Sequence, residues 1–116
     1  MTITIYGIKA CDTMKRARTW LDANGVAHGF HDYKAQGIDE ATLRRWIALV
    51  GWERLLNRAG TTFRKLPEAE RQDLDAQRAV RLMLAQPSMI KRPVLAIGDD
   101  ILVGFDPAAY AARLAR

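Results

Sequence analysis

The hydrophobic pattern changes its period along the chain, and each change predicts a helix or a strand. Residues 2–6 alternate and are β-branched, which predicts a strand. Residues 12–24 have apolar positions at helical spacing, which predicts a helix. The polar and aromatic segment 28–33 predicts a second strand, and a strand, helix and strand of this length form a parallel βαβ unit. The buried stripe of this helix is expected to consist of Met14, Ala17 and Leu21.

The middle of the chain is predicted to be helical. Asp39 is the expected cap of a helix that Gly51 ends. We expect a short helix over residues 52–59, a loop over 61–66 and one further helix between Pro67 and Pro87. The expected buried faces of the two longer helices consist of Leu43, Trp46, Ile47 and Val50, and of Ala76, Val80, Met83 and Leu84.

The last part of the chain returns to β-structure. The apolar runs Pro93–Ile97 and Ile101–Val103 flank a turn signal and predict a hairpin, and Asp106–Pro107 starts a terminal helix. This order has the outline of an α/β, thioredoxin-like fold with a mixed four-stranded sheet. A helical insertion, at about residues 38–88, lies between the second and third strands. At 116 residues, the chain fits a single domain over residues 1–116.

Composition and charge limit the partners of the protein. The formal net charge is +5, from 18 Lys and Arg against 13 Asp and Glu, which favours anionic partners. The cations are scattered without interleaved aromatics, which argues against nucleic-acid binding. No apolar run approaches the roughly 20 residues of a membrane span, and no leader pattern is visible, so we expect a cytoplasmic protein. His28 and His31 lack a ligand pattern around them, so neither a metal site nor a bound cofactor is expected.

Cys11 is the only cysteine, and it lies where the first strand gives way to the first helix. The unpaired N–H groups of a helix start lower the pKa of a thiol there, and Lys9 lies close in sequence. Thr13 is expected to bond the thiolate, or only to cap the helix, for which Asp12 is the other candidate. The alternative is that Cys11 is a small buried hydrophobe. Because no second cysteine exists, any thiol chemistry needs an outside thiol.

Basic residues around Pro93 and in the helical insertion are candidates for substrate binding. Lys91 and Arg92 precede Pro93, which either begins a strand or, with a cis bond, offers a backbone edge to a substrate. Arg92 would then supply charge to an anionic group. Arg58 and Arg64 flank a polar loop, where they are solvated surface residues or bind a carboxylate or oxyanion brought to the cysteine.

Four segments together resemble one known family. They are Ile3–Thr13 (ITIYGIKACDT), Leu55–Arg58 (LLNR), Gly60–Leu66 (GTTFRKL) and Ile90–Leu95 (IKRPVL). In this order, over essentially the whole chain, they resemble the arsenate reductase (ArsC) and Spx-like family, specifically its YffB-like branch. The resemblance implies a thioredoxin-like fold with a helical insertion and a nucleophilic cysteine at Cys11.

The resemblance also implies which arginines surround that cysteine. In arsenate reductases of the family, three arginines bind the oxyanion, and glutathione and glutaredoxin reduce the intermediate. Arg92 matches the second of them; the first falls on or beside Asn57, next to Arg58, and the third is replaced near Gly104. Lost charge-assisted hydrogen bonds cost roughly 1.5–3 kcal/mol each, which disfavours arsenate.

The sequence therefore favours a glutathione-dependent thiol-disulfide oxidoreductase that acts through a mixed disulfide on Cys11. Glutathione is the expected co-substrate and glutaredoxin a candidate partner. A true arsenate reductase is one alternative. A non-enzymatic regulator that binds RNA polymerase, as Spx-like relatives do, is the other. In that case no disulfide switch is available, because Met14 stands at the position of a second cysteine.

Overall fold

The computed structural model describes residues 2–114, which form two compact units. One unit, called here the sheet unit, consists of the residues up to Tyr33 and from Arg92 onward. The other, called here the helical unit, is Lys34–Lys91. Helices thus lie between the second and third strands, as predicted, while the single-domain organisation over residues 1–116 stays a prediction.

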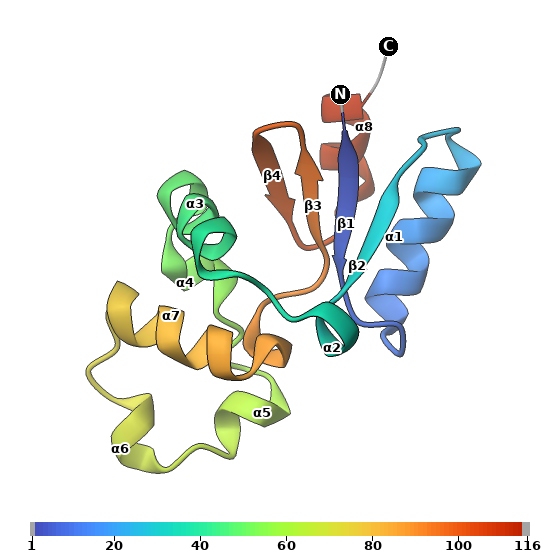
Figure 1. Ribbon diagram of the computed structural model, residues 1–116. Helices are drawn as coiled ribbons and strands as arrows, with labels where there is room; N and C mark the ends of the chain where they lie inside the picture. Colours follow the sequence, from blue (N-terminus) through green and yellow to red (C-terminus); the bar gives the residue numbers. More distant parts are fainter. Residues whose placement is uncertain (1, 115–116) are drawn as a thin grey trace. The chain divides into compact units, whose positions relative to one another are not determined.

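The sheet unit contains a mixed four-stranded sheet in the order β2-β1-β3-β4 (Figure 1). β1 is parallel to β2 and antiparallel to β3, and β3 forms a hairpin with β4. The predicted fold class is therefore confirmed. The strands are β1 (Ile3–Gly7), β2 (Gly29–Asp32), β3 (Val94–Ile97) and β4 (Asp100–Val103), and the helices of this unit are α1 (Asp12–Ala23) and α8 (Pro107–Leu114).

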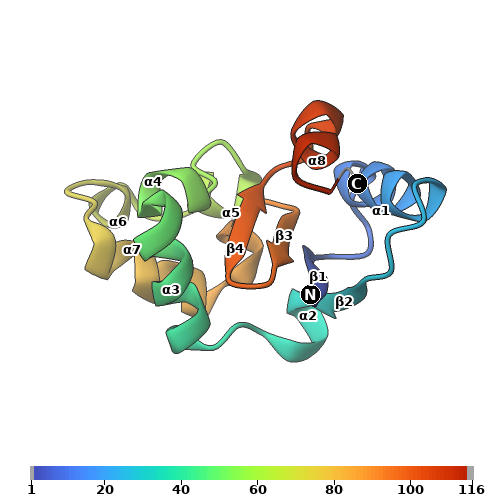
Figure 2. The same ribbon diagram turned by 90° about the horizontal axis from the view of Figure 1, so that it is seen from above.

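One face of this sheet packs against α1 and α8, which both lie on that side (Figure 2). Ile5, Leu95 and Ile97 project from this face because side chains alternate along a strand. They meet the buried residues of the two helices, which are Met14, Ala17, Leu21 and Tyr110. The stripe predicted for α1 is thus its buried face.

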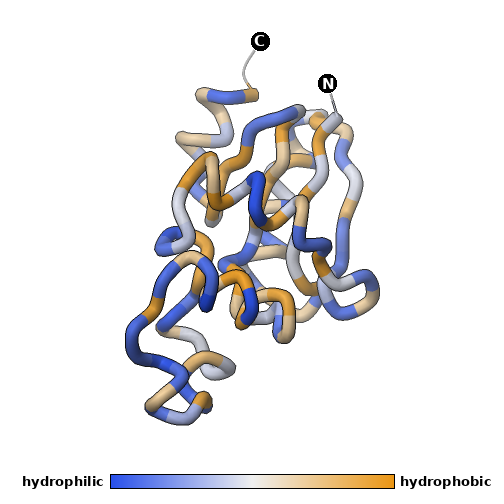
Figure 3. The backbone as a smooth tube through the Cα atoms, turned by 60° about the vertical axis from the view of Figure 1, so that its left-hand side comes forward, coloured by the Kyte–Doolittle hydropathy of each residue, from blue (hydrophilic) through white to orange (hydrophobic). Residues whose placement is uncertain are grey.

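The helical unit consists of short helices joined by tight turns. Asp39 caps α3 by accepting a hydrogen bond from the Thr42 N–H at 2.7 Å, and Asp75 caps α7 through the Arg78 N–H at 2.8 Å. Apolar and polar stretches alternate along the chain (Figure 3). Within residues 2–114, no helix is long and apolar enough to cross a membrane. The bounds are α2 (Tyr33–Gln36, whose first residue belongs to the sheet unit), α3 (Glu40–Val50), α4 (Trp52–Leu55), α5 (Thr61–Arg64), α6 (Glu68–Arg71), α7 (Ala76–Ala85) and the 3₁₀ turn η1 (Pro87–Met89).

Three predictions in this unit were wrong. The short helix expected over residues 52–59 ends at Leu55, because Leu56 is extended and forms a β-bridge with Ile90. The expected loop 61–66 contains α5, which is a single turn and too short to show helical periodicity. The expected helix between Pro67 and Pro87 is two helices, because Asp73 adopts a left-handed conformation with φ 53° and interrupts it. Ala76 consequently lies at the exposed start of α7, and Ala79 takes its expected place in the buried stripe.

Candidate functional site

The topology of the sheet unit brings three segments to one end of the sheet. Gly7, the last residue of β1, pairs with Asp32 of β2, which Tyr33 follows directly. Tyr6 pairs with Val94 of antiparallel β3, so Arg92 and Pro93 enter the sheet at the same end. Cys11 follows β1 after a three-residue connection. The carboxyl end of β1 is therefore the place where these side chains gather.

Cys11 is itself the N-cap of α1, and this corrects the prediction that Asp12 or Thr13 caps the helix. Its backbone is extended, with φ −142° and ψ 123°, while its carbonyl already accepts the Lys15 N–H at 3.0 Å. Asp12 is thus the first helical residue. A side chain at the N-cap faces the N–H groups of the second and third helical residues, which here are Thr13 and Met14.

This position lowers the pKa of Cys11. Partial burial raises the pKa, but the Met14 backbone N–H, the Arg92 side chain and then the Thr13 N–H act in the opposite direction and outweigh it. Arg92 lowers the pKa in two ways, as a hydrogen-bond donor to the thiolate and through its positive charge. The sulfur makes no cap hydrogen bond of ordinary geometry, yet these N–H groups still favour the thiolate. Such a thiol is a nucleophile.

Arg92 and Pro93 form the second segment of the site. The Arg92–Pro93 peptide bond is cis. Pro93 is buried, and its carbonyl accepts the Gly104 N–H at 2.8 Å, which ties the start of β3 to the end of β4. Gly104 has φ 82°, a conformation that side chains rarely adopt. The position near which the resemblance places a third arginine is thus built for glycine.

Three aromatic rings lie beside this end of the sheet. The Tyr6 and His31 ring centroids are 4.6 Å apart, and Tyr33 lies 6.1 Å from His31 and 6.3 Å from Tyr6. The sequence pattern placed residues 28–33 in a strand and gave Tyr33 no role. Its place at the end of the strand parallel to β1 was the one available signal.

The Tyr33 side chain is buried, at 3% exposed, and its hydroxyl has no hydrogen-bond partner. Burial raises its pKa strongly, Tyr6 adds to this, and the charge of Arg92 acts in the opposite direction. At neutral pH the group is therefore a protonated donor within electrostatic reach of Arg92. A buried donor without an acceptor costs about 1–3 kcal/mol, so this hydroxyl calls for an explanation.

The structure brings together some of the predicted residues. Thr13, through its N–H, and Arg92 both lower the pKa of Cys11, and Lys9 is exposed on the connection before the cysteine. The others lie in the helical unit, where their roles stay predictions. There the Arg58 guanidinium lies 5.8 Å from the Trp52 ring centroid, Arg64 is exposed on α5, and the Lys91 N–H donates to the Leu55 carbonyl at 2.8 Å.

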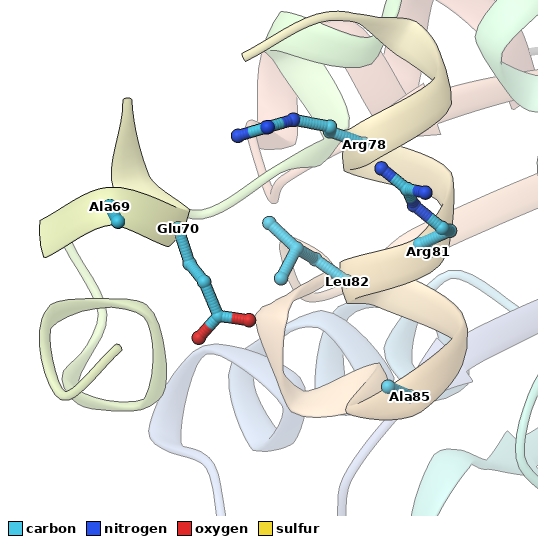
Figure 4. Close-up of a pocket in the computed structure, with 6 residues that line it drawn as sticks. All are labelled: Ala69, Glu70, Arg78, Arg81, Leu82 and Ala85. Carbon is cyan, nitrogen blue, oxygen red and sulfur yellow. The ribbon is translucent and has the colours of Figure 1, made fainter. Parts of the chain in front are cut away.

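A pocket of about 520 Å³ lies in the helical unit, between α6 and α7 (Figure 4). None of the predicted site residues lines it. Its walls are formed by Ala69, Glu70, Arg78, Arg81, Leu82 and Ala85. Within residues 2–114, no group of three or more His, Cys, Asp or Glu side chains is placed to hold a metal ion.

The chain as a whole is similar to several known proteins. The model of the ArsC family matches residues 6–113. A YffB protein of known structure is 68% identical, with a TM-score of 0.96, covering 98% of this chain and 100% of its own. An arsenate reductase (ArsC) related protein from Brucella melitensis is 59% identical, with a TM-score of 0.78 and coverage of 100% and 97%. An uncharacterized protein of Haemophilus influenzae is 38% identical, with coverage of 97% and 99%.

Proposed function

Because this chain belongs to the ArsC family, as the resemblance in its sequence predicted, we propose that it is a glutathione-linked thiol-disulfide oxidoreductase with Cys11 as the nucleophile. Family membership and the similarity to arsenate reductase-related structures support a thiol-based redox role. The observation that carries the finer proposal is the lowered pKa of Cys11, caused by the first-turn N–H groups and Arg92, which outweigh partial burial. A thiolate at neutral pH is the species that attacks a disulfide.

The reaction proceeds through a mixed disulfide. The Cys11 thiolate attacks the glutathione sulfur of a substrate R–S–SG. The Cys11–SG bond forms, the original S–S bond breaks, and the substrate leaves as a thiolate that takes a proton from solvent. A second glutathione thiolate then attacks the glutathione sulfur on Cys11, which releases oxidised glutathione and regenerates the Cys11 thiolate. Glutathione, or glutaredoxin in its place, supplies the thiol that this chain lacks.

Each neighbour of Cys11 has a part in this sequence. The Thr13 and Met14 N–H groups stabilise the negative charge of the thiolate, both before attack and when it leaves. Arg92 adds charge to the same sulfur and is available to the anionic substrate. Pro93 shapes the edge at which the substrate backbone docks. Lys9, Lys91, Arg58 and Arg64 are the candidates for glutathione carboxylates.

Arsenate reduction is the second candidate, since the relative from Brucella melitensis is related to arsenate reductases. A tetrahedral oxyanion needs several charge-assisted hydrogen bonds. Only Arg92 matches the family arginines directly, and the left-handed Gly104 marks the region of the missing third one. The disulfide reaction needs a thiolate and fewer cations, so the geometry favours it.

The decisive experiment measures Cys11 alkylation by iodoacetamide against pH, with mass spectrometry after incubation with oxidised glutathione. We expect a midpoint below the unperturbed value of about 8.5 and a glutathione adduct on Cys11. The protein should also reduce a glutathionylated peptide with glutathione as reductant, and Cys11→Ser should abolish this activity. An unshifted, unreactive thiol, or turnover that survives in Cys11→Ser, would refute the proposal.

Arg92→Gln tests the electrostatic part. The midpoint should move upward, because both a hydrogen bond and a positive charge are lost from the thiolate. Arg44→Gln is the matched control, since Arg44 lies on α3 and pairs with Glu40 at 2.7 Å. It removes the same charge and should leave the midpoint unchanged. Arsenate-dependent oxidation of glutathione, measured with glutaredoxin present, separates the second candidate from the first.

A further inference from the structure

The pocket between α6 and α7 has no part in the proposed reaction (Figure 4). Its volume of about 520 Å³ lies in the range of small-molecule sites, and its walls come from these two helices. Glu70 and Arg81 are exposed, while Arg78 and Leu82 are half-buried. A ligand from solvent can therefore reach the side chains that line it.

α7 has two different faces. Its buried residues are Ala79, Val80 and Met83, and the helix packs against α3, α4 and η1. The residues of α7 that line the pocket form a separate stripe at the spacing i, i+3, i+4 and i+7, which is Arg78, Arg81, Leu82 and Ala85. Across the pocket, α6 buries none of its own residues. Side-chain packing therefore does not close the space between the two helices.

The two walls of the pocket carry charges of opposite sign. Arg78 and Arg81 come from α7, and Glu70 comes from α6, with the Leu82 side chain pointing from α7 toward α6 (Figure 4). Arg78 Nη1 donates to the Gln72 carbonyl at 3.1 Å, which leaves other N–H groups of this guanidinium for a further acceptor. Within residues 2–114, neither Glu70 nor Arg81 forms an ion pair. Both charges are thus available to a ligand.

The arrangement of these side chains indicates the chemistry of the ligand. The two guanidinium groups match a carboxylate, which accepts charge-assisted hydrogen bonds from arginine. The Glu70 carboxylate matches an ammonium group at the opposite wall, and it would repel a ligand that is only anionic. Between the two walls, Leu82 offers apolar surface to an apolar group. A ligand that uses every part of the pocket therefore carries both charges with an apolar group between them.

We propose that the pocket between α6 and α7 binds a small zwitterion of the short-peptide class, with apolar side chains between a free amino and a free carboxyl group. The carboxylate lies at Arg78 and Arg81, the ammonium group at Glu70 and an apolar side chain on Leu82. Exposed ion pairs contribute little one at a time, so binding depends on all three contacts together. The inference does not depend on the reactivity of Cys11.

Titration of the full chain with the dipeptide leucyl-leucine, followed by backbone amide NMR, tests this proposal. The amide shifts should be saturable at millimolar dipeptide and confined to α6, α7 and the turn between them. Blocking either end of the dipeptide, as in N-acetyl-leucyl-leucine or leucyl-leucine amide, should weaken binding about fivefold, the loss of one exposed ion pair. Equal affinity for the free dipeptide and for N-acetyl-leucyl-leucine amide, in which both ends are blocked, would overturn the proposal. Absence of a saturable shift in these helices would overturn it as well.

Two substitutions assign the ends of the ligand. Arg81→Gln should weaken leucyl-leucine binding about fivefold and leave the affinity for leucyl-leucine amide unchanged, because that probe has no carboxylate. Glu70→Gln should weaken leucyl-leucine to the same extent and leave the affinity for N-acetyl-leucyl-leucine unchanged, because that probe has no ammonium group. Arg44→Gln is the matched control, since it removes the same charge from α3, where Arg44 pairs with Glu40, and should change neither affinity. If Arg81→Gln weakened both probes equally, or no more than Arg44→Gln does, the assignment of the carboxylate would be refuted.

Discussion

Replacing Cys11 by serine should change stability in a way that depends on pH. Serine is among the preferred N-cap residues, because its oxygen accepts a hydrogen bond from the second or third helical N–H. The Cys11 side chain makes no such bond of ordinary geometry. A good N-cap contributes about 0.5–2 kcal/mol over alanine. Cys11→Ser should therefore stabilise α1 by up to about that amount while the cysteine is protonated, although it abolishes the reactivity.

The sign of the pH dependence follows from the lowered pKa of Cys11, which the first-turn N–H groups and Arg92 produce against the effect of partial burial. Between the folded and the unfolded pKa, the unfolded chain holds a proton that the folded one has lost, so stability rises with pH. The contribution is complete above the unfolded value of about 8.5 and is lost as the pH falls through the folded pKa. The advantage of serine should therefore shrink as the pH rises.

Urea unfolding of the two proteins, from about pH 5.5 to about pH 9.5 with a non-thiol reductant, measures this difference. All other titrating groups are common to both proteins and cancel in the comparison. The slope of the difference is limited to about 1.4 kcal/mol per pH unit, because one proton is involved. Cys11→Ala, which neither caps nor titrates, separates the two effects. A difference between cysteine and serine that stays constant over this range would refute the lowered pKa.

Two further substitutions test the local structure. A Cβ built on Gly7 would collide with the side chain of Met14, which is 1% exposed, so Gly7→Ala should destabilise by about 1–3 kcal/mol in urea unfolding. Gly29→Ala is its control, because a Cβ there meets only Thr4 at 3.9 Å; equal losses would contradict the steric argument. Asp75→Ala should cost about 0.5–2 kcal/mol through the lost cap of α7, and Asp75→Asn much less. Similar losses in the two variants would show that the cap does not matter.

The sheet unit was predictable because local signals there agree with packing. The β-branched alternation of residues 2–6 and the helical spacing of Met14, Ala17 and Leu21 describe surfaces that are buried in the structure. The helical unit was less predictable. The single turn α5 and the left-handed Asp73 depend on one or two residues, and a periodicity needs a longer window to show them.

The residues of the candidate site also include some that the sequence could predict and some that it could not. Cys11 was predictable because its place between a strand and a helix determines which backbone groups it meets, and the registers of β1 and β3 bring Arg92 to the same end. Tyr33 was not predictable, since an unpaired hydroxyl arises from the packing around it and leaves no mark in the sequence. The cap was assigned to Asp12 or Thr13 for a related reason. Cysteine is not among the preferred N-cap residues, yet Cys11 occupies the N-cap position of α1 here.

The presence of a cysteine in place of a preferred N-cap residue indicates which anion the site stabilises. The groups that act on Cys11 are N–H groups of its own helix and one guanidinium, and all of them converge on the sulfur. They stabilise a thiolate whether it attacks or leaves, which serves both halves of a disulfide exchange equally. A tetrahedral oxyanion would need donors on several sides, and Gly104, with φ 82°, lies near the position where the sequence resemblance implies that the family's third arginine is replaced. In the proposed reaction, selectivity for an anionic substrate would then rest on Arg92, which acts on the sulfur directly.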